Sequence, residues 1–207
     1  MSSRELILAR VRRNQPSWRE LPAVPGFDRP MDDPLAAFGA ALARMGGTLV
    51  DAEPAKPLDA VIRALFPDAQ VICSAVPEAE GTRRIDAVHH PAELDDVDVG
   101  IVRAVFGVAE TGSVWLSEHE FVVNALGFLA QHLVVLLDPK AIVPNLHHAY
   151  RHRGFVDARY AVLMTGPSAT ADIEGVLIRG AQGVRSFTVV PIAAGPGLPG
   201  FEPRAEA

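Results

Sequence analysis

The chain has 207 residues, 49% of them hydrophobic, and a formal net charge of −6 at pH 7. This length and apolar content suit one domain with a substantial core, and the acidic balance argues against a nucleic-acid-binding protein. No apolar run reaches about 18 residues, so no membrane span is expected. The single cysteine, Cys73, lies in an apolar run and is expected to be a buried, unreactive thiol. We expect a cytoplasmic protein with no metal site and no cofactor in this chain.

The first predicted element is a helix that Ser3 caps and that runs to about residue 14. Four prolines between residues 16 and 30 then predict a loose linker. Residues 1–30 are therefore expected to form a helical arm and a Pro-rich linker. At the other end, glycines and prolines recur, and we expect a flexible tail over 193–207.

Strands and helices alternate through residues 31–192, which are expected to form a single α/β domain. Its first helix is capped by Asp33 and ends at Gly46 and Gly47. The pattern predicts further helices over 58–65, 138–153 and 168–178, and strands over 48–50, 70–75, 99–102, 105–109, 113–117, 133–137, 160–164 and 187–192. In the segment 138–153, Pro144 either kinks the helix or is the first residue of its main part. The alternation favours a mixed, mostly parallel sheet flanked by helices, with an antiparallel hairpin over 105–117. The apolar run 133–137 is typical of a strand that is covered on both faces.

Two polar turns follow apolar strands of this predicted sheet. The first is Glu-Thr-Gly-Ser at 110–113, and the second, 166–174, opens the helix predicted over 168–178. Ligands in open α/β sheets gather at the carboxyl ends of strands, so we expect both turns to line one pocket. Glu110 is the candidate catalytic carboxylate. The candidate ligand-binding residues are Thr111, Gly112, Ser113, Gly166, Ser168, Thr170, Asp172 and Glu174.

Each turn also has a purely structural interpretation. A Thr-Gly pair makes a tight turn, and Ser168 and Thr170 can cap a helix whose early acidic residues favour its positive end. In the functional interpretation, free backbone N–H groups at that helix start hold a carboxylate or another small anion. The residues alone leave both interpretations open.

Histidines on the helix predicted over 138–153 are interpreted as surface residues. Ala149 and Tyr150 mark its buried face, which turns His148 and His152 towards solvent. A solvated pair without a nearby carboxylate does not indicate a metal site.

Three segments together resemble a known family: 107–113 (Gly-Val-Ala-Glu-Thr-Gly-Ser), 131–134 (Gln-His-Leu-Val) and 166–174 (Gly-Pro-Ser-Ala-Thr-Ala-Asp-Ile-Glu). The combination is similar to the LUD domain, the family of lactate-utilisation protein C (LutC, also called YkgG). The resemblance implies a fold like that of the CoA-transferase and ribose-phosphate-isomerase superfamily. It also implies a role in oxidising L-lactate to pyruvate beside iron–sulfur partner proteins, which would hold the clusters.

Three functions remain open from the sequence. The first is an accessory component of L-lactate utilisation that binds a small anionic ligand and iron–sulfur lactate-utilisation subunits. The second is a free-standing CoA-transferase-like enzyme that uses Glu110, and the third is a small-molecule sensor without chemistry. The chain is compatible with an oligomer in each case.

Overall fold

A parallel sheet runs through the part of the chain that this computed structural model describes, residues 2–50, 57–172, 174–195, 197–198 and 200–204. Within these ranges, six strands pair in parallel in the order β1 (Thr48–Leu49), β12 (Ser186–Pro191), β7 (His132–Leu137), β4 (Val99–Arg103), β2 (Ile72–Ser74) and β3 (Arg83–Arg84). Because all of these pairs are parallel, the carboxyl ends of the strands lie at one edge of the sheet.

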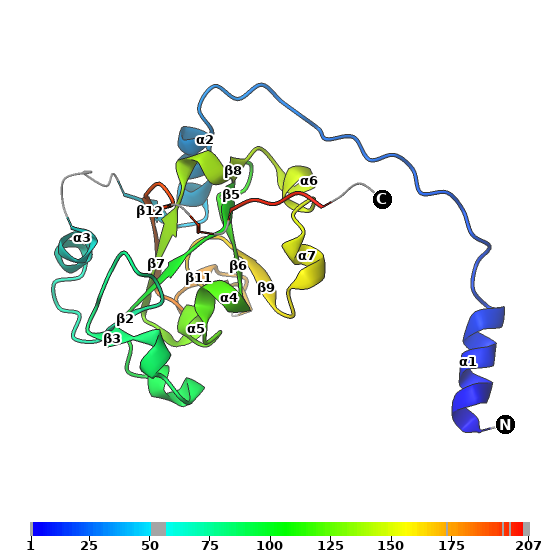
Figure 1. The fold of residues 1–207 in the computed structure, drawn as a ribbon, viewed down its shortest axis with the longest axis horizontal. Coiled ribbons are helices and arrows are strands. Elements are labelled where there is room, and N and C mark those ends of the chain that lie inside the picture. Colours follow the sequence, from blue (N-terminus) through cyan, green and yellow to red (C-terminus); the bar gives the residue numbers. More distant parts are fainter. Residues whose placement is uncertain (1, 51–56, 173, 196, 199, 205–207) are drawn as a thin grey trace.

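A smaller sheet continues directly from β4. In the described chain it contains four strands, in the order β8 (Ile142–Val143), β5 (Phe106–Val108), β6 (Ser113–Ser117) and β9 (Ala161–Met164). β6 is antiparallel to β5 and to β9, which confirms the hairpin predicted over 105–117. β8 runs parallel to β5. The fold is the expected mixed α/β architecture, with a mostly parallel central sheet flanked by helices (Figure 1).

Short helices flank the sheets, except for α1 (Ser3–Arg13), which stands apart from them. The described helices are α1 (Ser3–Arg13), α2 (Pro34–Arg44), α3 (Leu58–Leu65), α4 (Glu118–Phe121), α5 (Leu126–Leu129), α6 (Leu146–Ala149) and α7 (Gly154–Asp157), with 3₁₀ turns η1 (Ile85–Ala87), η2 (Pro91–Leu94) and η3 (Pro139–Ala141). α2 begins as predicted, because Asp33 accepts a hydrogen bond from the backbone N of Ala36 at 2.9 Å. None of the helices in these ranges is long and apolar enough to cross a membrane.

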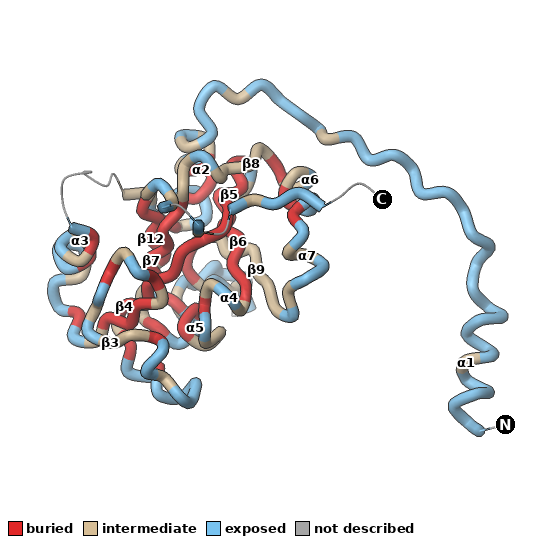
Figure 2. Tube along the Cα trace, viewed as in Figure 1, coloured by how far each residue is buried: buried red, intermediate tan, exposed pale blue. Residues whose placement is uncertain are grey.

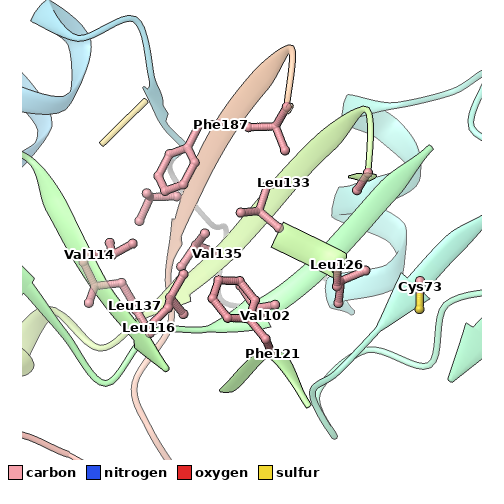
Figure 3. Packing of buried hydrophobic residues seen from close by; sticks show 14 of the residues in the cluster. Cys73, Val102, Val114, Leu116, Phe121, Leu126, Leu133, Val135, Leu137 and Phe187 are labelled. Atoms are coloured by element: carbon pink, nitrogen blue, oxygen red, sulfur yellow. The ribbon is translucent and has the colours of Figure 1, made fainter. Parts of the chain in front are cut away.

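The apolar run of β7 is covered on both faces, as predicted. On one face, its alternate side chains share a core with Val114 and Leu116 of β6 (Figure 3). On the other face, Val134 and Leu136 pack with Ile62 of α3. Burial of each such side chain contributes roughly 1.5–3 kcal/mol to folding. β7 therefore anchors both layers, and Figure 2 shows the buried residues concentrated in the two sheets.

The prediction of a helix over 168–178 is wrong. β10 (Ala169–Thr170) and β11 (Ile178–Arg179) instead form an antiparallel pair. Between them, Glu174 and Gly175 have φ angles of +54° and +69°, a left-handed conformation that a right-handed helix does not contain. Val176 and Leu177, which an amphipathic helix here would bury, are exposed. Ile173, the third residue of that apolar face, lies outside the described residues.

The helix predicted over 138–153 forms only in part. Residues 139–143 instead form η3 and β8, because β8 pairs with β5, and the main part expected from Pro144 onwards is shortened to α6. Helical spacing therefore does not extend from Ala149 to His152. Tyr150, expected to be buried, is 57% exposed, whereas His152, expected at the surface, is 5% exposed.

The end of the chain packs on the smaller sheet. The ring of Phe201 lies against that of Phe106, with centroids 5.3 Å apart. His152 Nδ1 accepts a hydrogen bond from the backbone N of Glu202 at 3.1 Å. Residues 201 and 202, within the segment expected to be a flexible tail, thus contact parts of the chain that are distant in the sequence.

Helix α1 stands apart from the two sheets, and none of its side chains is buried (Figures 1 and 2). Its N-cap is Ser2 and not the predicted Ser3. Ser2 Oγ accepts a hydrogen bond from the backbone N of Glu5 at 3.3 Å, and the carboxylate of Glu5 accepts one from the backbone N of Ser2 at 2.7 Å. This reciprocal capping box accounts for the start of the helix.

Candidate functional site

Glu110 lies in the β5–β6 turn, where the neighbouring segment 144–146 holds it. Its backbone N donates to the carbonyl of Pro144 at 3.1 Å, and its Oε2 accepts a hydrogen bond from the backbone N of Leu146 at 3.1 Å. Glu110 is nevertheless exposed. The carboxylate is thus fixed in position and still accessible to a ligand.

A cavity of about 570 Å³, which we call the Glu110 cavity, opens beside this carboxylate. It is formed by the linker before α2, by α2 itself, by the end of β5 and by the segment 144–147. Its polar side chains are Arg29, Arg44, Glu110, Asn145 and His147, and the rest of its wall is apolar. A concave site with an apolar wall and a few converging polar groups is typical of small-molecule binding.

Asn145 fixes the linker wall of this cavity. Its Nδ2 donates to the carbonyl of Gly26 at 2.8 Å, and its Oδ1 accepts a hydrogen bond from the backbone N of His148 at 3.0 Å. The ring of His148 in turn contacts the carboxylate of Asp28. The linker, expected to be loose, is therefore held against the domain at residues 26–28.

Two guanidinium groups, of Arg29 and Arg44, line the Glu110 cavity together with the carboxylate of Glu110. A guanidinium stays charged and binds carboxylates through paired hydrogen bonds, while an ionised carboxylate only accepts them. The cavity can therefore hold a small anion whose hydroxyl group donates to Glu110.

The hydroxyl groups of the first turn lie outside this cavity. Thr111 Oγ1 is 2.7 Å from Ser113 Oγ, which also contacts Thr165 Oγ1 at the start of the second polar turn. The first turn is therefore linked to the start of the second by a chain of hydroxyl groups, in which Ser113 is only 5% exposed. These hydrogen-bonded hydroxyl groups connect β6 to the end of β9. A ligand pocket shared by the two turns stays a prediction.

The two turn glycines allow close packing against the end of α2. Gly112 and Gly166 both have φ angles of +68°. A Cβ at Gly112 would overlap the backbone N of Leu42, and one at Gly166 would lie 2.6 Å from the carbonyl oxygen of Met45. Both positions thus require glycine for conformation and for space. Ligand binding by these turns stays a prediction.

The second polar turn does not supply the expected helix start. The backbone N of Ser168 donates to the carbonyl of Val184 at 3.1 Å, so it is not free to bind an anion. Thr170 lies in β10, and Asp172 and Glu174 are exposed beyond it. These residues are not part of the Glu110 cavity. Their contact with a ligand stays a prediction, although the helical donors that motivated it do not form.

Four polar residues of the Glu110 cavity were not among the predicted site residues: Arg29, Arg44, Asn145 and His147. Arg29 lies in a Pro-rich stretch, and Arg44 lies at the end of an amphipathic helix, where basic residues are common for electrostatic reasons. No local pattern distinguishes them, because the cavity joins segments that are far apart in the sequence.

The sequence pattern of the LUD domain matches residues 88–192 of this chain. The chain belongs to the LUD domain family. A crystal structure of a DUF162 family protein from Deinococcus radiodurans resembles it with a TM-score of 0.54 and 17% sequence identity, covering 76% of this chain and 95% of that one. This likeness shows a shared fold. Comparison with curated proteins gives no match.

The LUD domain of this chain contains Glu110, both polar turns and the segment 144–147. Arg29 and Arg44 precede the matched residues, so the Glu110 cavity lies between the LUD domain and the residues before it. The LUD domain family is associated with lactate utilisation in general.

Proposed function

We propose that this chain is an accessory component of L-lactate utilisation. In this role it binds a small carboxylate anion in the Glu110 cavity and acts in the cytoplasm with iron–sulfur proteins that oxidise L-lactate to pyruvate. The observation that carries the proposal is that Arg29, Arg44 and Glu110 line the same cavity. The family's association with lactate utilisation supports the same conclusion.

The side chains of the cavity match the groups of a 2-hydroxy acid. The two guanidinium groups suit its carboxylate, and Glu110 can accept a hydrogen bond from its hydroxyl. The electron-transfer chemistry belongs to the iron–sulfur partners in this proposal, and this chain binds and presents the anion.

Calorimetric titration of L-lactate into the full-length chain tests the anion site. We expect binding that weakens at least about tenfold in the double variant Arg29→Gln/Arg44→Gln, because hydrogen bonds to charged groups contribute about 1.5–3 kcal/mol and 1.4 kcal/mol corresponds to tenfold. Arg63→Gln, on an exposed position of α3 outside the cavity, is the matched control. Unchanged affinity in the double variant would contradict the proposed site.

Affinity purification from the native host tests the proposed partners. Proteins that bear cysteine clusters should copurify with the chain. Recovery of the chain free of such proteins, together with lactate binding, would favour the small-molecule sensor instead.

The fixed and accessible carboxylate of Glu110 supports a second candidate, a free-standing CoA-transferase-like enzyme. In that enzyme the carboxylate of Glu110 would attack the carbonyl carbon of an acyl-CoA thioester, which breaks the C–S bond, releases the CoA thiolate and leaves an acyl-glutamyl anhydride. Acyl-CoA turnover that Glu110→Gln abolishes would favour this function, and turnover that the substitution leaves unchanged would exclude the role of Glu110.

A further inference from the structure

The Glu110 cavity is larger than L-lactate requires. Its volume is about 570 Å³. An engineered cavity of about 150 Å³ in another protein holds benzene, and lactate has as many non-hydrogen atoms as benzene. Cavities of about 300–1,000 Å³ are typical of ligands considerably larger than lactate. Lactate that binds through its carboxylate and hydroxyl groups therefore leaves most of the Glu110 cavity to water.

Apolar side chains form much of the wall of this cavity. They are Phe27, Met31, Ala37, Ala40, Ala109 and Pro144. Ala37 and Ala40 are three residues apart on α2, so they share one face of the helix, and each side chain is a single methyl group. An apolar ligand group against such a wall removes apolar surface from water, which strengthens binding.

Phe27 has the largest apolar side chain of the wall, and its backbone is strained. Its φ angle is +51°, a left-handed conformation that is uncommon for a bulky residue. Asn145 holds this conformation, because its Nδ2 donates to the carbonyl of Phe27 at 3.3 Å as well as to that of Gly26. Backbone strain of this kind is frequent where a segment closes on a ligand.

The ring of Phe27 is fixed on the wall and still available to a ligand. It lies against the imidazole of His147, with ring centroids 4.5 Å apart, and both residues line the Glu110 cavity. Phe27 is nevertheless 58% exposed. An exposed aromatic ring in a cavity gains contacts when an apolar group of a ligand packs against it, and aromatic groups gain most.

We propose that the Glu110 cavity prefers a 2-hydroxy acid with a large apolar side chain, and that Phe27 determines this specificity. The inference rests on the proposed function, in which Arg29, Arg44 and Glu110 bind the carboxylate and the hydroxyl. The side chain of the acid packs against Phe27 and against the face of α2 that carries Ala40. Lactate has the same polar groups, but its methyl group makes few of these contacts.

Two probes test the preference: L-lactate and L-3-phenyllactate, which differ only by the phenyl ring. In calorimetric titrations of the full-length chain, we expect phenyllactate to bind at least about tenfold more tightly, because burial of an aromatic ring is worth at least that factor. Lactate binding with equal or weaker binding of phenyllactate would overturn this inference and leave the proposed anion site intact. Tight binding of phenyllactate without lactate binding would support the inference and contradict the proposed lactate role, and binding of neither would overturn both.

The variant Phe27→Ala tests the role of the aromatic ring. We expect it to weaken phenyllactate binding about three- to tenfold and to change lactate binding by less than about twofold. Trp18→Ala is the matched control, because Trp18 is an 86% exposed aromatic of the same linker that does not line the cavity. Equal losses for both ligands in Phe27→Ala would show that the ring only holds the linker, and would overturn its role in specificity.

The variant Ala40→Leu tests the same preference from the α2 side. Ala40 is exposed and lines the cavity, and leucine is a good helix former, so the variant should fold and reduce the space for a ligand. We expect phenyllactate binding to weaken at least about threefold, with lactate binding unchanged. Ala36→Leu, at an exposed position of α2 that does not line the cavity, is the control. Unchanged phenyllactate binding in Ala40→Leu would overturn the placement of the side chain against α2.

Discussion

Gly112 shows how a single residue links the first polar turn to α2. Its φ angle is +68°, and a Cβ there would overlap the backbone of Leu42. We expect Gly112→Ala to lower the free energy of unfolding by about 3–5 kcal/mol, because backbone strain and overpacking each cost roughly 1–3 kcal/mol. Denaturant unfolding measures this loss.

Gly175→Ala is the matched control for this prediction. Gly175 has a φ angle of +69°, but a Cβ there would meet nothing within 4 Å. Only the left-handed backbone is penalised, at about 1–2 kcal/mol. Equal losses in the two variants would contradict a packing role for Gly112.

His152 makes the stability of the smaller sheet depend on pH. Burial lowers the pKa of its imidazole below the ordinary value of 6.5, and the same cause lowers the pKa of His132. The unfolded chain therefore binds protons more readily than the folded chain as pH falls below about 6.5. The folded state is therefore fully stable with respect to these two histidines above their unfolded pKa. Its free energy of unfolding decreases as the pH falls from about 7 towards their lowered pKa values in the folded chain.

We expect His152→Gln to reduce, without abolishing, the loss of stability between about pH 7 and pH 5, since His132 still contributes. Thermal or urea unfolding across this range measures the slope. A slope identical to that of the parent chain would show that His152 is not held neutral by burial.

At the level of residues, local chemistry predicted part of the structure. Cys73 is buried as expected, and desolvation raises the pKa of its thiol to about 11. Glu110 occupies the tight turn that its Thr-Gly neighbours indicate. Arg29 and Arg44 could not be predicted as site residues, because only tertiary structure brings them to Glu110.

Among the elements, the C-terminal segment is the clearest case of a structure that distant contacts impose. Phe201 packs against Phe106 and His152, with ring centroids 5.3 Å and 5.4 Å apart. We expect Phe201→Ala to destabilise the chain by about 2 kcal/mol, given roughly 1.5–3 kcal/mol for a fully buried aromatic and partial burial here. Val156→Ala, at a 61% exposed position of α7, serves as the control in the same unfolding assay. Equal stability of the Phe201 variant and the parent chain would show that the segment is not docked in solution.

The sequence predicted correctly the elements whose hydrophobic pattern is strong over consecutive residues. It did not predict the segments whose conformation depends on pairing with another strand. The run 133–137 and the hairpin over 105–117 carry their pattern in consecutive residues. The helix predicted over 168–178 and the first part of the helix predicted over 138–153 do not form, because β10 pairs with β11 and β8 pairs with β5. Tertiary context overrides helix propensity in both segments.

At the scale of the whole molecule, the fold brings segments that are far apart in the sequence to the Glu110 cavity. This cavity lies between α2, the linker and the smaller sheet. The alternation of strands and helices predicted the architecture that places it. It could not predict the cavity, because one of its walls depends on how the linker docks.

Growth on L-lactate as sole carbon source tests the central claim most directly, in a strain of the native host from which the gene is cleanly deleted. We expect the deletion strain to fail to grow on L-lactate. The parent chain and Arg63→Gln should restore growth, whereas Arg29→Gln/Arg44→Gln should not. Normal growth of the deletion strain, or full restoration by the double variant at equal protein level, would contradict a role of the Glu110 cavity in lactate utilisation.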